Sequence, residues 1–392
     1  MTIPGPLSGL KVIEIAGLGP VPYCGMMLAD AGAEVTMIER IGSDGTAVST
    51  YTALERGRRH LAMDLKRPEA VEILLSLVEH ADAMFEGFRP GVAERLGFGP
   101  DACMARNPRL VYGRVTGWGR EGPLAQKAGH DINYIALTGV LHAIGTQGGK
   151  PVVPLNVIAD FGGGGLLLAF GMMCALLHAR ATGHGQVVDA AMIDGAASFM
   201  APFTGPGAEW GFDERPGMGV LAGAPPYYDT YETADNRFLA IGSLEPVFYS
   251  RLLRAMQLDE ERFLRGAFPA LDAVVRGEIW PELKRELAAV IKTRTRDEWC
   301  AILADVDACC TPVLTLGEAM GHPHHRARGT FVDVGGAIQP GPAPRFGGTP
   351  AGAPLPPRRR GEDTRDVLRE SGLAEQRIDA LIAAGVVSAA SA

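Results

Sequence analysis

The segment AGHDINYIALTGVL, residues 128–141, places a histidine beside an aspartate among small, apolar and aromatic residues. An unperturbed histidine has a pKa of about 6.5, so His130 can take up or release a proton near neutral pH. No serine or cysteine nucleophile motif accompanies His130 and Asp131. The pair is therefore a candidate for acid–base chemistry.

A second carboxylate stands in the segment LNVIADFGGGG, where Asp160 precedes four glycines. Asp160 at the N-cap of a helix would bind free backbone N–H groups, which is a purely structural role. Glycines, however, cost up to about 1 kcal/mol each relative to alanine in a helix. Without side chains they let a ligand approach the helix N-terminus, where negative charge is favoured. Both roles stay open at this point.

A third carboxylate, Glu245, lies in IGSLEPVFY between a predicted strand and Pro246. Proline is common at the first position of a helix, so a helix is expected to begin here. A glutamate near a helix N-terminus is also common, because of the helix dipole. Taken alone, Glu245 does not indicate a particular chemistry.

Basic residues follow the predicted strands of the N-terminal part. Arg40 comes after the second strand and Arg89 after the third, and the others are Arg56, Arg58, Arg59, Lys66 and Arg95. Loops at the carboxyl ends of neighbouring parallel strands converge on one crevice. Clustered cations there would suit a nucleotide that carries phosphates. The alternative, which these residues favour equally, is that they form a solvated charged surface.

The turn GLGPVPYCG resembles a dinucleotide-binding fingerprint only in part. Gly17 and Gly19 match, but its sixth position is Pro22. Glu39 lies about 20 residues on, where a ribose-binding acid would be expected. A tight turn between strand and helix explains the glycines, so NAD is not the expected ligand.

The elements that must position these residues alternate between strand and helix. Strands are predicted in 10–17, 33–40, 82–88 and 109–119, and helices in 23–32 and 68–81. This order predicts a parallel sheet with crossover helices. The apolar run 161–177 is shorter than the roughly 20 residues that a membrane span needs, so it is predicted to be a buried helix. A strand and a helix follow within 185–200.

The remaining sequence predicts a second unit. Residues 201–226 are rich in glycine and proline and are interpreted as a linker. A β-hairpin with its turn at Asp235 and Asn236 comes next, followed by helices at 246–257, 277–292 and 296–304. Near the end, strand-like sequence in 331–357 precedes a solvated run of three arginines at 358–360. Two short helices close the chain, with Thr364 as N-cap.

Composition narrows the class of protein. The 392 residues predict two domains, and the net charge of -8 argues against non-specific binding to nucleic acid. The six cysteines form no CxxC pair and no secretory signal is recognised, so reduced thiols in the cytoplasm are expected. The final SAASA is not a peroxisomal address.

Together, the segments GPVPYCGMMLADAGAEVTMIER, GHDINY, PLNVIADFGGGG and GSLEPVFY resemble the family III CoA-transferase (CaiB/BaiF) superfamily. Within it they resemble the alpha-methylacyl-CoA racemase branch, and the similarity extends over nearly the whole chain. The resemblance implies an α/β fold, with a Rossmann-like CoA-binding domain from 1–200 plus 330–392. A linker at 201–226 and a smaller α+β domain at 227–329 complete a chain that forms an interlocked homodimer.

The same resemblance implies the site residues. His130 and Asp160 match the catalytic pair, and Glu245, supplied by the partner subunit, matches the residue that supports the histidine. The positions expected to contact CoA are Arg40, Met63, Lys66, Gly87, Phe88, Arg89, Arg95 and Tyr134. Asp131 is expected to be structural. His142 replaces a small polar residue and is expected to have a surface or packing role.

The implied reaction interconverts (2R)- and (2S)-2-methylacyl-CoA thioesters by 1,1-proton transfer through an enolate. His130 and Asp160 would act on opposite faces of C2, and Gly162–Gly165 would offer donors to the enolate oxygen. No separate cofactor is expected because CoA is part of the substrate, and neither a metal nor membrane insertion is expected. One alternative is a CoA-transferase with Asp160 as nucleophile. Another is a non-catalytic CoA-binding protein.

Overall fold

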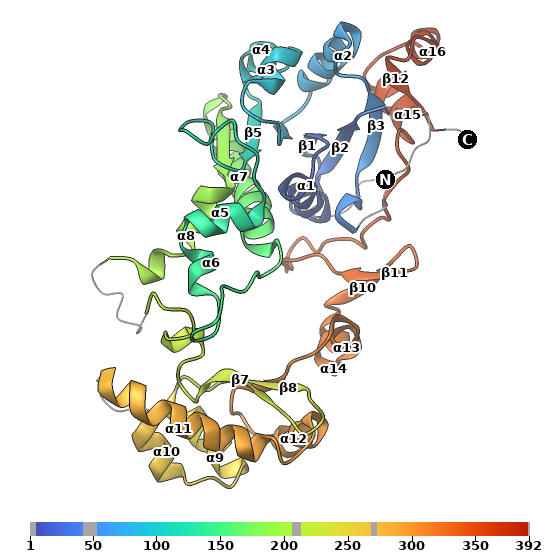
Figure 1. The fold of residues 1–392 in the computed structure, drawn as a ribbon. Helices are drawn as coiled ribbons and strands as arrows, with labels where there is room; N and C mark the ends of the chain where they lie inside the picture. The colour runs from blue at the N-terminus through green and yellow to red at the C-terminus, as the bar shows by residue number, and fades with distance from the viewer. Residues whose placement is uncertain (1–4, 42–52, 206–212, 268–272, 391–392) are drawn as a thin grey trace. The chain divides into compact units, whose positions relative to one another are not determined.

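The computed structural model describes residues 5–41, 53–205, 213–267 and 273–390. The chain divides into two compact units (Figure 1). Unit 1 consists of Met1–Thr138, Leu155–Ser198 and Pro323–Ala392, and unit 2 of Gly139–Pro154 and Phe199–His322. Residues 139–154, assigned to the large domain from the sequence, thus belong to unit 2. Part of the expected linker, 206–212, lies outside the described residues.

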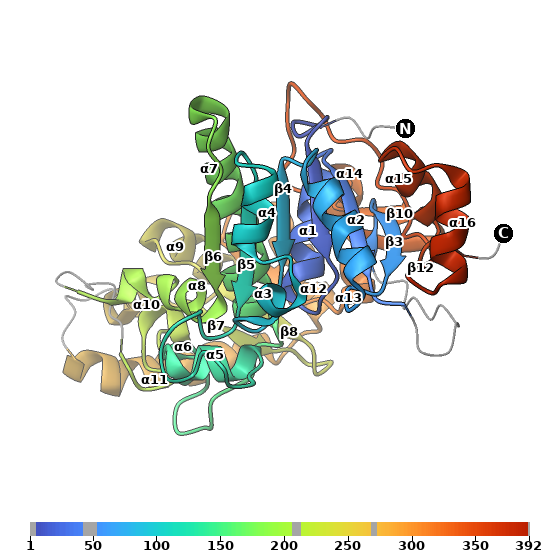
Figure 2. The same cartoon turned by 90° about the horizontal axis from the view of Figure 1, so that it is seen from above.

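Unit 1 contains a seven-stranded sheet in the order β12-β3-β2-β1-β4-β5-β6 (Figure 2). The strands are β1 Lys11–Ile15, β2 Glu34–Glu39, β3 Arg59–Met63, β4 Ala83–Glu86, β5 Val111–Thr116, β6 Val187–Ala191 and β12 Val387–Ser388. All pairs are parallel except the edge pair of β12 with β3. The order 3-2-1-4-5-6 is that of a Rossmann fold, which confirms the predicted fold class.

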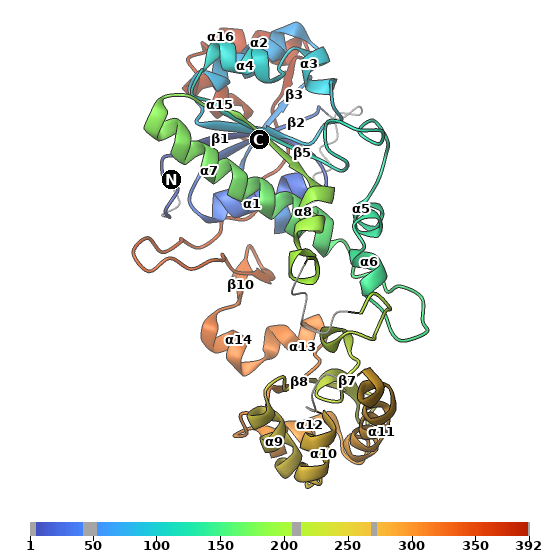
Figure 3. The ribbon, with the colours of Figure 1, turned by 90° about the vertical axis from the view of Figure 1, so that its left-hand side faces the viewer.

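Helices cover both faces of this sheet (Figure 3). One face carries α2 Pro68–Val78, α3 Val92–Leu96, α4 Pro100–Arg106, α15 Thr364–Glu370 and α16 Glu375–Ala383. The other carries α1 Pro20–Asp30, the π-helix η2 Val157–Leu166, α7 Leu167–Thr182 and α8 Met192–Ser198. Because both faces are covered, β4 and β5 are buried at every position. Unit 1 also includes η1 Ala53–Glu55, α5 Asp131–Leu137, α14 Pro323–Arg328 and the hairpin of β10 Phe331–Val334 with β11 Ala337–Pro340.

Strand β3 was not predicted, because its sequence RHLAM and the preceding arginines read as a charged surface. In the structure Arg56 and Arg58 are buried and paired with acids of the core. Arg56 lies 2.5 Å from Asp30 and Arg58 lies 3.3 Å from Glu14. Burial raises the pKa of Glu14 to about 7, although Arg58 opposes the rise. These arginines therefore stabilise the fold and do not contribute to a ligand crevice.

The long apolar helix differs from the prediction. It extends without a break over Val157–Thr182, and its residues pack on α1, β5 and β6. Its other face is open: Leu166, Phe170 and Leu177 are 46%, 65% and 69% exposed. The predicted buried helix is therefore buried on one face only. Among the described residues it is the one helix that is long and apolar enough to cross a bilayer, and contact with the sheet accounts for its buried side.

Unit 2 is built on a three-stranded antiparallel sheet. The strands are β7 Tyr228–Glu232, β8 Phe238–Gly242 and β9 Cys310–Pro312. The helices are α6 Val140–Ala143, α9 Pro246–Ala255, α10 Glu260–Ala267, α11 Ala273–Ile291, α12 Arg296–Leu303 and α13 Leu316–Gly321, with short turns η3 Ala201–Phe203 and η4 Val220–Ala222. The predicted hairpin is confirmed, with Asn236 at φ 56° in its turn. Helix α10 was not predicted.

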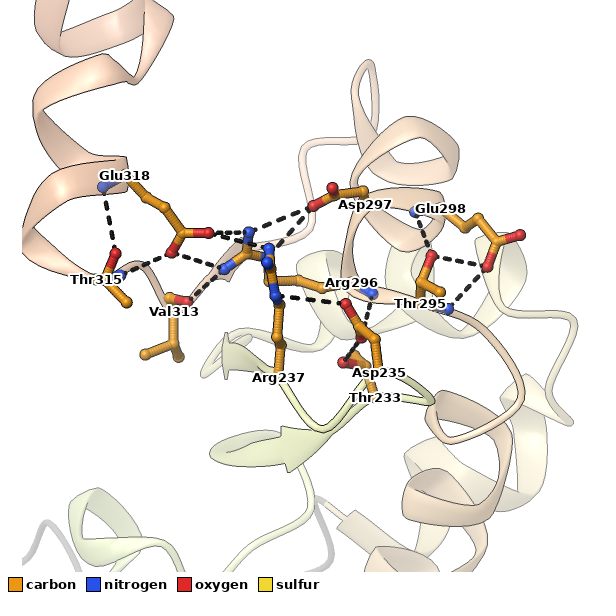
Figure 4. A network of polar contacts seen from close by, with 10 residues as sticks. All are labelled: Thr233, Asp235, Arg237, Thr295, Arg296, Asp297, Glu298, Val313, Thr315 and Glu318. Atoms are coloured by element: carbon orange, nitrogen blue, oxygen red, sulfur yellow. Dashed lines mark hydrogen bonds and ion pairs between the residues drawn. The ribbon is translucent and has the colours of Figure 1, made fainter.

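A polar network centred on Arg296 joins the hairpin to two helices of unit 2 (Figure 4). Its guanidinium group donates to the carbonyl of Val313 and to the carboxylate of Glu318 at 3.0 and 2.8 Å. Its backbone N–H donates to Asp235 in the hairpin turn. Hydrogen bonds from Arg296 lower the pKa of Glu318 to about 2. This arginine thus fixes the start of α12 to the turn and to α13.

The C-terminal segment differs from its prediction at two points. Asp363, and not Thr364, is the N-cap of α15. The buried hydroxyl of Thr364 instead accepts the N–H of Ala62 and donates to the carbonyl of Ser388. Arg360, predicted to be solvated, lies 3.2 Å from Glu39 at the end of β2. These contacts tie the tail to the sheet, and sequence spacing alone does not show them.

Candidate active site

The candidate site lies where the parallel strands of unit 1 end. Gly19 follows β1, Arg40 follows β2 and Arg89 follows β4. In the observed strand order, β1 and β4 are neighbours at the point where the order reverses. Ligands of open α/β sheets bind at such switch points. The loop after β4 also lies close to the start of α1, since a Cβ on Gly87 would come within 2.6 Å of the Val21 side chain.

Asp160 lies within the first turns of η2, whose N-cap is Asn156. Asp160 is therefore not the N-cap of this helix, which rules out the capping alternative. Instead, the side-chain amide of Asn156 donates to the Asp160 carboxylate at 3.0 Å. Leu155, immediately before, has a left-handed backbone with φ 60°. Such strained residues and π-helical turns cluster at functional sites.

The glycines after Asp160 are required for packing between helices. A Cβ on Gly163 would come within 2.8 Å of the backbone nitrogen of Ala196 in α8. On Gly165 it would come within 2.6 Å of the carbonyl oxygen of Pro20 in α1. The helix has begun before this run, so Gly162–Gly165 do not form its N-terminus. The helix N-terminus, from which these glycines were expected to offer donors to an enolate oxygen, therefore lies earlier, at Asn156.

The Asp160 carboxylate is half-buried and lies beside the turn that follows β1. A Cβ on Gly19 would come within 3.0 Å of Asp160 Oδ2, and Gly19 itself has φ 60°. Burial raises the pKa of Asp160, the hydrogen bond from Asn156 opposes the rise, and the Asp131 carboxylate adds to it. A raised pKa favours a carboxyl group that exchanges protons.

His130 is the exposed N-cap of α5. Its backbone N–H donates to the side-chain oxygen of Asn133 at 3.0 Å. The next residue, Asp131, is buried, and its Oδ2 accepts the backbone N–H groups of Ala159 and Asp160 at 2.6 and 2.9 Å. The histidine also interacts electrostatically with Asp160. The structure thus brings the predicted pair together on α5 and η2.

Tyr134 connects this pair to the loop after β4. Its ring is 4% exposed and packs edge-on against Trp118, with centroids 4.7 Å apart. A Cβ on Gly117 would overlap this ring, so glycine is needed where β5 ends. Burial raises the pKa of Tyr134 to about 12, and both Asp160 and Arg89 act on it electrostatically. The predicted CoA contacts Tyr134 and Arg89 therefore lie in the same neighbourhood as Asp160, one of the two predicted catalytic residues.

A buried ion network supports the loop Gly87–Arg89. Glu86 accepts the backbone N–H of Phe88 and receives the Nε of Arg114 at 2.8 Å. The other two nitrogens of Arg114 bind Glu94 of α3 at 2.7 and 3.1 Å. Because Arg114 is buried on β5, it fixes the loop between β4 and α3 to the sheet.

The other predicted positions differ in exposure. Arg40, Lys66 and Arg95 are exposed. Met63 is 1% exposed and packs in the core. In unit 2, His142 lies exposed on α6, and Glu245 is the exposed N-cap of α9 with Pro246 at N1.

The alternative of a dinucleotide site is disfavoured by Glu39. Its carboxylate accepts the N–H of Gly361 and lies 3.2 Å from both His60 and Arg360. The acid that would bind a ribose is therefore already occupied by the fold. In the part of the chain that the structure describes, no group of three or more His, Cys, Asp or Glu residues is arranged to hold a metal.

Three residues of the site had no catalytic or ligand-binding role assigned from the sequence: Gly19, Asp131 and Asn156. Gly19 had been noted as part of a turn and Asp131 as structural. The one available signal for Asn156 was its position four residues before Asp160, which is one helical turn. The bonds from Asp131 to η2 span 28 and 29 residues and leave no local pattern.

Comparisons with known proteins place nearly the whole chain in one family. The family model described as CoA-transferase family III matches residues 7–364. Over 378 residues, 95% of each chain, the protein is 43% identical to alpha-methylacyl-CoA racemase of Mus musculus. Its identity to alpha-methylacyl-CoA racemase of Homo sapiens is 40% over the same share of both chains. The crystal structure of a CAIB/BAIF family protein from Brucella suis is similar with a TM-score of 0.79 at 25% identity, covering 94% of this chain and 100% of that chain.

Proposed function

The chain belongs to CoA-transferase family III, and on this premise we propose that it is a racemase of 2-methylacyl-CoA thioesters. The observation that carries the proposal is the pairing of His130 with Asp160. They are two titratable groups of different type on adjoining elements, because the carboxylate of Asp131, next to His130, accepts the backbone N–H of Asp160 at 2.9 Å. The similarity to two alpha-methylacyl-CoA racemases at 43% and 40% identity supports the same reaction.

The proposed chemistry is a proton transfer at C2, next to the thioester carbonyl. One group removes the C2 proton, and the electron pair moves onto the carbonyl oxygen to give an enolate. The other group then donates a proton to the opposite face of C2 as the carbonyl re-forms. Asp160, whose pKa is raised by burial, and His130 exchange these roles between the two enantiomers. A single turnover therefore inverts C2 without net gain or loss of protons.

Glu245 is proposed to support the histidine from the partner subunit. Its carboxylate is exposed and makes no capping hydrogen bond to its own helix α9. A carboxylate beside His130 would orient the imidazole and stabilise its protonated form.

The alternative within the family is CoA transfer. In that reaction the Asp160 carboxylate would attack the thioester carbonyl, expel CoA thiolate and form a mixed anhydride. The CoA thiolate would then attack the aspartyl carbonyl of this anhydride, which releases the first carboxylate and forms an aspartyl-CoA thioester at Asp160, and from there CoA passes to a second carboxylic acid. This chemistry removes no C2 proton. The family description favours it as the second candidate.

One assay separates the two reactions. The protein is incubated in heavy water with one enantiomer of a 2-methylacyl-CoA, with and without a free carboxylic acid. A racemase inverts the substrate and places deuterium at C2 of both enantiomers. A transferase leaves C2 undeuterated and forms a new thioester from the added acid. A non-catalytic CoA-binding protein does neither.

CoA itself is expected to bind through the loop after β4. Replacing Arg89 by alanine should weaken CoA binding about tenfold or more, because a charge-assisted contact to phosphate is lost. Isothermal titration calorimetry with CoA measures this effect. Arg109→Ala is the control. Arg109 is exposed and lies just before β5 begins, at the end of the sheet opposite to the candidate site, so this variant should bind CoA like the wild type. Tight NAD binding without CoA binding would contradict the proposal.

The proposal includes a homodimer. The exposed apolar stripe of Leu166, Phe170 and Leu177 on η2 and α7 supports it, because these residues share one helical face and large exposed apolar surfaces mark interfaces. Sedimentation equilibrium should give about twice 41.4 kDa. Phe170→Asp should weaken the dimer, whereas Phe170→Leu should keep it. A fully active wild-type monomer would refute this part.

The proposal also covers the cofactor and the cellular compartment. No separate cofactor is needed, since CoA is part of the substrate. A cytoplasmic location fits the six free cysteines, which a reducing compartment preserves.

A further inference from the structure

Asp131, next to the candidate base His130, binds the backbone of another helix. It is the first residue of α5 and is 3% exposed. Its Oδ2 accepts two consecutive backbone N–H groups of η2, those of Ala159 and Asp160. A carboxylate on one helix therefore binds the backbone of another helix at the candidate catalytic residue.

We propose that Asp131 is a positioning residue for the proton transfer: its carboxylate joins the backbone of Asp160 to the helix that begins at His130, and so fixes the two acid–base groups relative to each other. The inference rests on the proposed racemase function. It assigns Asp131 no contact with the substrate.

The way in which η2 begins supports this role. The first N–H groups of a helix lack partners within the helix, and a side chain at the N-cap normally accepts one of them. Here the N-cap residue is Asn156, and its amide donates to the Asp160 carboxylate instead. The acceptor for Ala159 and Asp160 comes from α5. Asp160 is therefore held at its backbone by Asp131 and at its carboxylate by Asn156.

Because Asp131 follows His130 directly, its carboxylate links the helix that begins at His130 to the backbone of Asp160. The N–H of His130 is held by Asn133, within α5, so the histidine backbone and Asp131 move with one helix. Removal of the link between α5 and η2 would let the two groups separate. A misplacement of about 1 Å can cost a reaction 10²-fold, so this single contact has a large expected effect on rate.

Asp131 also places a negative charge beside Asp160. Its Oδ1 is buried and has no hydrogen-bond partner in the described part of the chain. The groups that act on Asp160 are Asp131, which raises its pKa, and His130 and Asn156, which lower it, with Tyr134 also nearby. Removing the charge at position 131 should therefore lower the pKa of Asp160.

Two substitutions separate position from charge. Asp131→Asn keeps an oxygen that can accept both N–H groups but removes the charge, and Asp131→Ala removes both. The control is Asp82→Asn, since Asp82 accepts the backbone N–H of Lys11 at the opposite end of the sheet. For each variant, kcat, KM, CoA affinity, thermal unfolding and the exchange rates of the Ala159 and Asp160 amides are measured.

We expect Asp131→Ala to lower kcat about 10²-fold with KM and CoA affinity within about twofold, and to speed exchange of both amides. Asp131→Asn should keep the amides protected and retain kcat within about tenfold. In each direction of the reaction, the limb of the pH–rate profile that reports Asp160 should move to lower pH. Asp82→Asn should alter neither kcat nor the profile.

The outcomes that would overturn the inference are specific. If the wild type racemises and Asp131→Ala keeps its kcat, Asp131 does not position the pair. If Asp131→Ala is unfolded, Asp131→Asn decides: unprotected amides or an unshifted profile contradict the inference. A wild type that shows no C2 exchange refutes the proposed function itself, which is a different result.

Discussion

Replacing either His130 or Asp160 by alanine should reduce racemisation by about 10²–10⁴-fold, the usual range for loss of a general acid or base. Each enantiomer needs both groups, one to remove the C2 proton and one to return it. Each variant should therefore lose rate in both directions, from (2R) to (2S) and from (2S) to (2R). The measurement is optical rotation of a 2-methylacyl-CoA, with deuterium at C2 followed in heavy water.

Two further variants calibrate this result. His142→Ala removes another exposed histidine, from α6 of unit 2, and should leave the rate unchanged. Glu245→Gln should reduce the rate less than His130→Ala, because it removes support for the imidazole and not the imidazole itself. None of the four substituted residues is among the positions expected to contact CoA, so CoA affinity should change little in all four variants.

The contrary outcome is equally specific. Hydroxylamine reacts with an anhydride or thioester on a carboxylate, so it would trap Asp160 in a transferase. If Asp160 is trapped in this way and no deuterium enters C2, the racemase proposal is wrong. His130→Ala would then retain transfer activity, since that reaction uses the aspartate as nucleophile.

The sequence predicts the sheet well where burial is complete. Strands β1, β2, β4 and β5 lie between two helical layers, so their residues form short apolar runs. Strand β3 was missed because Arg56 and Arg58 stand at its entry, and their acids, Asp30 and Glu14, are distant in sequence. Ion pairs over such separations follow from the fold and leave no local pattern.

The candidate site was also predicted in part. His130 and Asp160 came from motif resemblance, and the structure places them on adjoining elements of unit 1. Asp131 was expected to be structural, but its partners could not be predicted, since they are backbone N–H groups, which every residue except proline carries. The packing of the glycine run after Asp160 against α1 and α8 was not predicted, because a sequence does not show which atoms approach a missing side chain.

That glycine run predicts a second large effect, at a residue that touches neither substrate nor acid. Gly195 of α8 lies against Gly163 of η2, and both are buried. A Cβ on Gly195 would come within 2.0 Å of the Gly163 carbonyl oxygen and 2.5 Å of its Cα. These are backbone atoms, so no rotamer change can relieve the overlap. The two helices would have to separate, and η2 carries Asp160.

Gly195→Ala should therefore destabilise the protein by about 1–3 kcal/mol or more, as overpacking of a core does. It should also lower kcat about 10²-fold through displacement of Asp160. The control is Gly347→Ala, because a Cβ there meets no atom within 4 Å. Thermal unfolding gives the stability, and the C2 exchange assay gives kcat on the folded fraction. If Gly195→Ala keeps wild-type stability and rate while Gly347→Ala does the same, then the close contact of α8 with η2 does not position Asp160.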